Sequence, residues 1–213
     1  MKRKQKYNAQ ALSEPISVGR KRDHLLDSKI LDATLDVLAK VGASGLTMDL
    51  VAARAGAGKG AIYRRWRSKS ELVIDAIAHL KRGHIDLPNL PDTGTLRGDL
   101  LALFKPLPKR ERDRWSKVMS ALASLVGQDQ SLSDAANDVV VEPWVEAHLA
   151  LMRRAAGRGE IPASADVEVL SRIVPIVAAY RTLVLRKDFD SDFLTTMIDC
   201  VILPAIGLKS HKT

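Results

Sequence analysis

Residues 47–72, TMDLVAARAGAGKGAIYRRWRSKSEL, limit the possible folds more than any other part of the chain. Thr47 is a suitable N-cap, because its hydroxyl can accept a backbone N–H two or three residues later. Gly56 can adopt the left-handed conformation that ends a helix. In the next short helix Ile62 and Trp66 are four residues apart and therefore share one face. The pattern predicts a helix-turn-helix unit. The apolar face expected for its first helix consists of Leu50, Val51, Ala52 and Ala55.

Two further helices flank this unit. The 3.6-residue period of apolar residues predicts a preceding helix that ends at Gly42. Ser68 is placed to cap a following helix, whose apolar stripe consists of Leu72, Val73, Ala76, Ile77 and Leu80. Two prolines and several turn residues make 84–94 a connector. We therefore expect a helix-turn-helix domain at 24–83 and a larger domain at 92–208.

Charge is segregated along the chain. The net charge is +8, but residues 1–83 hold 17 Lys and Arg against 8 Asp and Glu, a balance of +9. The remaining 130 residues hold 16 against 17, a balance of −1. A positive excess in the half that carries a helix-turn-helix is what phosphate binding requires. The alternative, that the charges only solvate the surface, leaves this coincidence without an explanation.

The same region resembles the DNA-binding domain of TetR-family transcriptional repressors. The resemblance covers roughly residues 25–80 and rests on the order and spacing of these residues: Thr47, Val51, Ala52, Ala55, Gly56, Ile62, Tyr63, Trp66, Ser68, Lys69 and Leu72. It implies an all-α protein in which an N-terminal helix-turn-helix domain precedes a helical domain for ligand binding and dimerisation. Double-stranded DNA is the implied partner.

The DNA contacts are expected from the outward face of the second short helix and its surroundings. A short helix with small, basic and aromatic residues on its free face fits the DNA major groove. The predicted DNA-binding residues are Thr47, Lys59, Gly60, Tyr63, Arg64, Arg65 and Lys69. We expect base contacts from Lys59, Tyr63 and Arg64. Phosphate contacts are expected mainly from Thr47, Arg65 and Lys69.

Residues 1–23 are polar and basic, with too little apolar surface to order themselves. Two interpretations stay open for this arm. It lies along phosphates or enters a minor groove, or it is a disordered tail that aids solubility.

The second domain is predicted to contain about five helices. Hydrophobic residues make up 46% of the chain but aromatic residues only 4%, and no strand-like alternation is present. We expect the helices at about 95–105, 109–127, 131–157, 166–186 and 191–206. Pro143 should kink or open the third of these helices, while Asp166 and Ser191 are the expected caps of the last two.

Resemblance implies that this domain dimerises and captures a small molecule that releases DNA. The predicted dimer interface consists of Val169, Ile173, Val177, Leu194, Ile198, Val201 and Ile202. A homodimer would present two helix-turn-helix units to a near-palindromic operator. The alternative is that some of these residues only fill the core of one protomer.

A ligand pocket is expected where bulky and polar side chains share helix faces. The predicted lining consists of Trp115, Met119, Trp144, His148, Met152 and Tyr180. An apolar cavity with a few polar groups is the usual composition of a small-molecule site. The alternative is that these residues are ordinary core.

Motifs of catalysis and cofactor binding are missing from the sequence. It holds no nucleophile elbow, P-loop, GxGxxG, HExxH or paired-cysteine pattern, so we expect no enzyme, metal or cofactor. No apolar run approaches 18 residues and no secretory signal is visible, so we expect a cytoplasmic protein without a membrane partner. The single cysteine, Cys200, agrees with a reducing compartment.

The leading interpretation is a ligand-responsive transcriptional repressor. One alternative is a constitutive dimeric DNA-binding protein without ligand response. An alternative of another class is a helical enzyme or carrier for an apolar small molecule.

Overall fold

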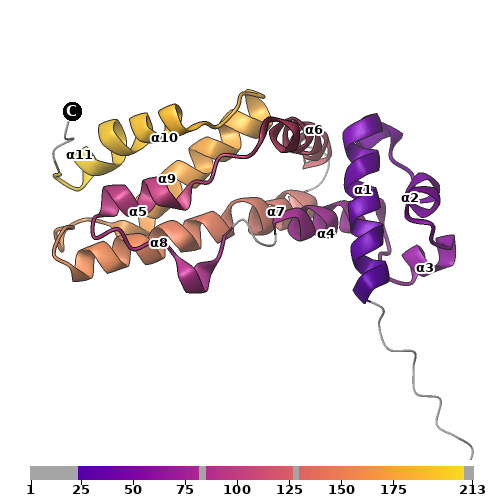
Figure 1. Cartoon of the computed structure of the whole chain (residues 1–213), viewed down its shortest axis with the longest axis horizontal. Coiled ribbons are helices and arrows are strands. Elements are labelled where there is room, and N and C mark those ends of the chain that lie inside the picture. Colours follow the sequence, from indigo (N-terminus) through magenta and orange to yellow (C-terminus); the bar gives the residue numbers. More distant parts are fainter. Residues whose placement is uncertain (1–23, 82–84, 127–129, 209–213) are drawn as a thin grey trace, which may run out of the picture.

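Helices form the regular structure of residues 24–81, 85–126 and 130–208, which are the residues that the computed structural model describes (Figure 1). The all-α prediction is confirmed. Helices α1–α3 lie at one end of an elongated molecule, and the C-terminal helices lie at the other. The basic arm 1–23 is outside the described residues.

Four helices build the N-terminal region: α1 (His24–Gly45), α2 (Met48–Ala55), α3 (Lys59–Tyr63) and α4 (Lys69–Lys81). The regular part of α1 stops where predicted, because Gly42 has φ 71° and ψ −177°, which are not helical values. The hydroxyl of Ser68 accepts the backbone N–H of Glu71 at 3.1 Å and so caps α4.

Both expected caps of α2 are present. The Thr47 hydroxyl accepts the backbone N–H of Leu50 at 3.2 Å, and Gly56 has the left-handed φ of 62°. The predicted apolar face needs a correction, because Leu50 is 46% exposed. Met48 and Val51, which are buried one turn apart, define the inward face of α2. Leu50 lies between them in the sequence and therefore points outward.

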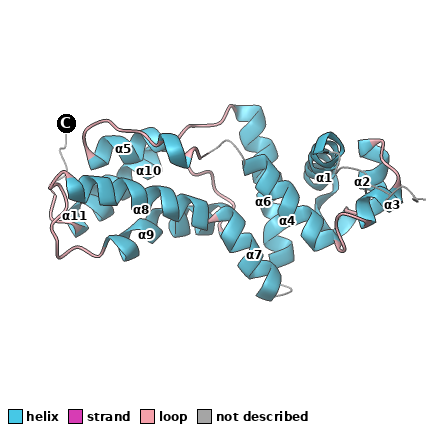
Figure 2. Ribbon diagram, turned by 90° about the horizontal axis from the view of Figure 1, so that it is seen from below, coloured by secondary structure: helices cyan, strands magenta, loops and turns pink. Residues whose placement is uncertain are grey.

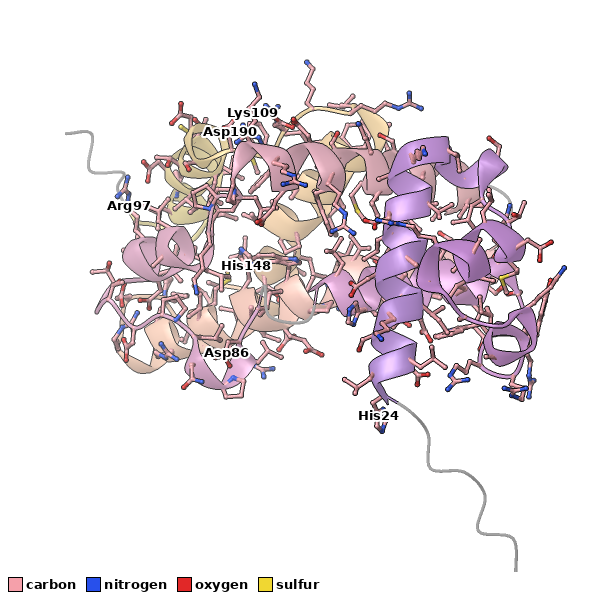
Figure 3. All side chains as sticks on the ribbon, turned by 45° about the vertical axis from the view of Figure 1, so that its right-hand side comes forward. His24, Asp86, Arg97, Lys109, His148 and Asp190 are labelled. Carbon is pink, nitrogen blue, oxygen red and sulfur yellow. The ribbon has the colours of Figure 1, made fainter. Side chains whose placement is uncertain are left out.

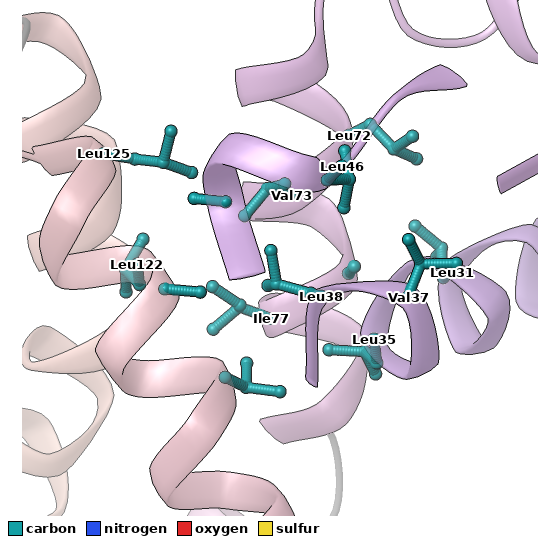
Figure 4. Close-up of a cluster of buried hydrophobic side chains, with 14 of the residues drawn as sticks. Leu31, Leu35, Val37, Leu38, Leu46, Leu72, Val73, Ile77, Leu122 and Leu125 are labelled. Carbon is teal, nitrogen blue, oxygen red and sulfur yellow. The ribbon is translucent and has the colours of Figure 1, made fainter. Parts of the chain in front are cut away.

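The hydrophobic core does not stop at the expected domain boundary. Helices α6 (Lys109–Val126) and α7 (Gln130–Val140) join the cluster that α1 and α4 begin. Figure 4 shows Leu122 and Leu125 of α6 on the side of α4 that carries Val73 and Ile77. Figure 2 shows α4, α6 and α7 between helices α1–α3 and the remaining helices. The helix-turn-helix domain is therefore packed, through α1 and α4, against the helices that follow the connector.

A second core holds the C-terminal end together. Its main helices are α5 (Leu96–Leu103), α8 (Glu142–Gly157), α9 (Val167–Ala179) and α10 (Ser191–Met197). The π-helix η3 (Ile198–Ile202) and α11 (Leu203–Ala205) complete it. Two further short segments are η1 (Leu87–Asn89) and the π-helix η2 (Tyr180–Val184), whose Leu183 packs against the first core.

Two helix ends in this region refine the expectations. The helix expected at 131–157 is divided into α7 and α8, with Pro143 in the first turn of α8, where its missing N–H costs no hydrogen bond. Asp166 caps α9 as predicted. The cap of α10 is Asp190 rather than Ser191, because the Asp190 carboxylate accepts the backbone N–H of Phe193 at 2.8 Å.

Among the described residues, no helix is long and apolar enough to cross a membrane.

Candidate nucleic-acid interface and ligand cavity

Helix α3, which we call the recognition helix, is fixed by its apolar side. Ile62 is fully buried and Trp66 is 4% exposed. The Trp66 indole N–H also donates to the Asp75 carboxylate of α4 at 2.8 Å. These contacts orient the opposite side of the helix toward solvent, where the side chains of Lys59, Tyr63 and Arg64 are exposed.

The exposed face of the recognition helix is basic and has a small residue at its centre. A Cβ on Gly60 would lie 3.6 Å from Nη1 of Arg64, so the guanidinium lies along this glycine. The Lys59 ammonium contacts Asp49 of α2, with 2.7 Å between Nζ and Oδ1. The hydrogen bond and the charge of Asp49 raise the pKa of Lys59. A base contact by Lys59 must therefore compete with Asp49.

Three predicted phosphate-binding residues have different surroundings. Thr47 is exposed, and its hydroxyl can still donate while it accepts the capping N–H. The side chain of Arg65 is only 13% exposed. It pairs with Asp27 of α1 and donates to the Ala61 carbonyl at 3.0 Å. The Lys69 ammonium donates to the Ala43 carbonyl at 3.1 Å. In this structure Arg65 and Lys69 hold elements of the N-terminal region together.

Sequence reasoning missed an ion-paired link between α2 and α6. The Asp36 carboxylate of α1 contacts Arg54 of α2 at 2.6 Å through one oxygen and Arg114 of α6 at 2.8 Å through the other. The sequence held no signal for it, because residues 18 and 78 positions apart from Asp36 meet only through helix packing.

A cavity of about 370 Å³ lies among α5, α6, α8, α9 and α10. Four of the six predicted lining residues surround it: Trp115, Met119, Trp144 and His148. Met152 lies one turn beyond His148 and is fully buried in the neighbouring core. Tyr180 is 53% exposed on the outer side of its helix. The expected lining is corrected at these two positions.

The rest of the cavity wall comes partly from loops. Phe104, directly after α5, and Phe189, directly before α10, both line it, and their rings meet edge to face with centroids 5.6 Å apart. Helix α9 and the following π-helix contribute Pro175 and Thr182. Loop aromatics carry no helical period, so their position in the cavity wall cannot be predicted from sequence alone.

His148 is the buried polar side chain of the cavity wall. It lies near the middle of the C-terminal helices (Figure 3) and is 4% exposed. Its Nδ1 lies 2.7 Å from the Trp144 carbonyl oxygen. Burial lowers the pKa of His148 to about 4, against the opposing effect of this hydrogen bond, so the ring is neutral at pH 7.

An apolar surface covers the outer side of α9 and η2, which are also a wall of the cavity. We call it the α9 face. It consists of the exposed Val169, Ile176, Tyr180 and Val184 and the half-buried Ile173 and Val177. Val201 of η3 is also exposed, at 39%. Leu194, Ile198 and Ile202 are 3% exposed or less, so the expectation that they form intermolecular surface is corrected. They face the core of their own protomer.

Comparisons with known proteins agree with this arrangement. Residues 30–76 match the family described as bacterial regulatory proteins, tetR family, and residues 90–201 match the tetracyclin repressor-like C-terminal domain. An uncharacterised helix-turn-helix transcriptional regulator of Mycobacterium bovis is 33% identical over 84% of this chain and 87% of its own. The DNA-binding transcriptional repressor TetR of Mycobacteroides abscessus is 31% identical over 87% of this chain and 96% of its own.

Solved structures share the fold. A TetR transcription regulator from Haloarcula marismortui superposes with a TM-score of 0.63 at 18% identity, covering 87% of this chain and 98% of its own. The regulator FadR from Bacillus subtilis, solved in complex with stearoyl-CoA, has a TM-score of 0.53 at 17% identity and covers 84% and 96%.

Proposed function

The chain belongs to the TetR family of transcriptional regulators, and from this premise we propose that it is a dimeric repressor that a small, mostly apolar molecule releases from its operator. One observation carries the ligand response: α6 both lines the cavity and is ion-paired to the DNA-binding region. Trp115 lies in the cavity wall, and the adjacent Arg114 binds Asp36, which also binds Arg54. A ligand that shifts α6 therefore acts on α1 and α2 directly.

The recognition helix supplies the sequence-specific contacts in this proposal. Tyr63 and Arg64 read base edges, and Lys59 joins them when DNA displaces Asp49. Gly60 lets the helix backbone approach the groove closely. Thr47 donates to phosphate. Arg65 and Lys69 act mainly by positioning the recognition helix, because their donors already bind Asp27 and the Ala43 carbonyl.

Dimerisation brings two recognition helices to one near-palindromic operator. We assign the interface to the α9 face together with Val201, because these apolar side chains are exposed in one protomer. Two half-sites separated by about one helical turn of DNA then match the two-fold symmetry of the protein.

Two other functions make different predictions. A constitutive DNA-binding protein would have no use for a cavity of about 370 Å³ beside α6. A helical enzyme or carrier would not need the basic excess of residues 1–83, and the relatives described above are transcription regulators.

The test is a binding-site selection with random duplex DNA, followed by a small-molecule screen on the selected site. The proposal expects a near-palindromic site and a molecule that lowers the affinity for it about 5- to 150-fold, the usual range of allosteric coupling. Specific binding without any effector in a broad screen would favour the constitutive protein. Absence of sequence preference at moderate salt would favour the enzyme or carrier.

A further inference from the structure

The hydrogen bond between His148 and its own helix fixes which ring nitrogen carries the proton. The Trp144 carbonyl oxygen is only an acceptor, so Nδ1, which lies 2.7 Å from it, must be the donor. The ring is neutral at pH 7, because its pKa is about 4. Nε2 therefore has no hydrogen and is a hydrogen-bond acceptor.

Nε2 is buried, and none of the described residues donates a hydrogen bond to it. Within the described ranges, no residue forms a hydrogen bond or ion pair with Nε2, and His148 is 4% exposed in the cavity wall. The other polar residues of the wall are half-buried or exposed: Lys105, Arg112, Ser116, Thr182 and Asp188. A buried acceptor without a donor is unfavourable, and a bound molecule with a matching donor removes that penalty.

The other residues that line the cavity determine the rest of the ligand chemistry. Trp115 and Trp144 offer apolar and aromatic surface, and Met119 offers a polarisable thioether. The charged groups of the wall lie at exposed positions, where Arg112 pairs with Asp188 at 3.5 Å. A carboxylate next to Nε2 would place two acceptors together and would bury an unpaired charge, which is strongly unfavourable.

We propose that the effector carries a neutral hydrogen-bond donor, a phenol or alcohol hydroxyl, which donates to Nε2 of His148 while its apolar body fills the cavity. This inference rests on the proposed function, in which the cavity is the effector site. His148 is thus the residue that selects a neutral hydroxyl compound over an ether, a hydrocarbon or a carboxylate of the same shape.

The experiment compares para-pentylphenol with its methyl ether, which keeps the apolar body but has no donor. Calorimetric titration of the full-length protein at pH 7 should give about tenfold tighter binding of the phenol, since a net hydrogen bond contributes about 1.4 kcal/mol. His148→Phe keeps an aromatic ring without the acceptor and should bind the two probes equally. His148→Gln, which keeps an acceptor near the position of Nε2, should restore part of the preference.

Each other outcome overturns a separate statement. Equal binding of both probes to the wild type refutes the donor requirement but leaves the cavity as an effector site. A preference that persists in His148→Phe removes the role of His148. Failure of both probes to bind argues against the cavity as the effector site, and with it against this inference.

Nuclear magnetic resonance of the histidine nitrogens tests the same statement without a substitution. The wild type should show the tautomer protonated at Nδ1, and the phenol, but not its methyl ether, should shift the Nε2 resonance. Protonation at Nε2 in the free protein would contradict the assignment.

Discussion

At the scale of single residues, Arg64 offers the most direct test of the predicted base contacts. Its guanidinium lies along Gly60 on the free face of the recognition helix, and no described acidic residue pairs with it. Arg64→Ala should therefore cost about 1–3 kcal/mol of operator binding and relax the preference at one base pair. Fluorescence anisotropy with the selected site and its single-base variants measures both effects.

Arg153→Ala is the matched control for this prediction, because Arg153 is exposed on α8 and, within the described part of the chain, has Glu168 as its ion-pair partner. It should leave operator binding unchanged. Unchanged affinity and unchanged sequence preference in Arg64→Ala would mean that another face of the N-terminal region reads the bases.

His148 predicts how stability depends on pH. Its pKa is about 4 in the folded protein and about 6.5 in an unfolded chain, so the unfolded state binds more protons between these values. The contribution of the neutral His148 ring to the stability of the fold is therefore complete above about pH 6.5 and is lost as the pH falls toward 4. Over this window, the free energy of unfolding measured with denaturant should change by about 1–3 kcal/mol less for His148→Phe than for the wild type. An identical pH dependence of wild type and variant would contradict the burial of a neutral ring.

The residue-level features that were predictable are those with local causes. Thr47 and Gly56 act within one turn of α2, so sequence alone identified both caps. The pairing of Arg65 with Asp27 was not predictable, because 38 positions separate the two residues and only the folding of the N-terminal region brings them together. The position of Arg65 in the sequence therefore suggested a phosphate contact but carried no information about its acidic partner.

At the scale of helices, α6 connects the cavity to the DNA-binding region. Helix α4, which directly follows the recognition helix in the chain, does not make this connection, because none of its described residues lines the cavity. The contact of α6 with α1 instead joins residues that are far apart in the chain. A helix that touches both sites is the element on which effector and operator can have opposing preferences.

Removing the central carboxylate of this link should weaken coupling more than stability. Asp36→Asn leaves Arg54 and Arg114 without an ionised partner, yet these groups are partly exposed, so the stability loss should stay near or below about 1 kcal/mol. We expect effector and operator each to bind, with the effect of one on the other reduced several-fold. Arg110→Ala, which changes an exposed residue of α6, should keep the coupling. Full coupling in Asp36→Asn would exclude this link as the route.

Helix faces were predicted less well than helix positions. The last apolar segment has one side buried in its own protomer, at Leu194, Ile198 and Ile202, and another exposed at Val201. An apolar side chain has the same period whether it meets its own core or a second chain. The sequence therefore located the helix, and only the structure separated its two sides.

At the scale of the whole molecule, the basic region and the apolar α9 face belong to different parts of one elongated protomer (Figure 1). In a two-fold dimer, a surface contacts the same surface of the partner only if it lies on the symmetry axis. We therefore expect the axis to pass through the α9 face, which leaves both recognition helices free to bind DNA. This arrangement connects dimer formation to operator affinity, because one recognition helix alone contacts only half a site.

A substitution that places a charge on the α9 face should therefore both separate the protomers and weaken DNA binding. Ile176 is 51% exposed in one protomer, so Ile176→Glu can fold but would bury an unpaired carboxylate in the dimer, which costs several kcal/mol. Analytical ultracentrifugation at micromolar concentration should detect a dimer for the wild type and a monomer for the variant. The matched control is Leu87→Glu, which puts the same charge on the 41% exposed Leu87 of the connector and should leave the dimer intact. A wild-type monomer, or an Ile176→Glu dimer with full operator affinity, would contradict the assignment of the α9 face as the dimer interface.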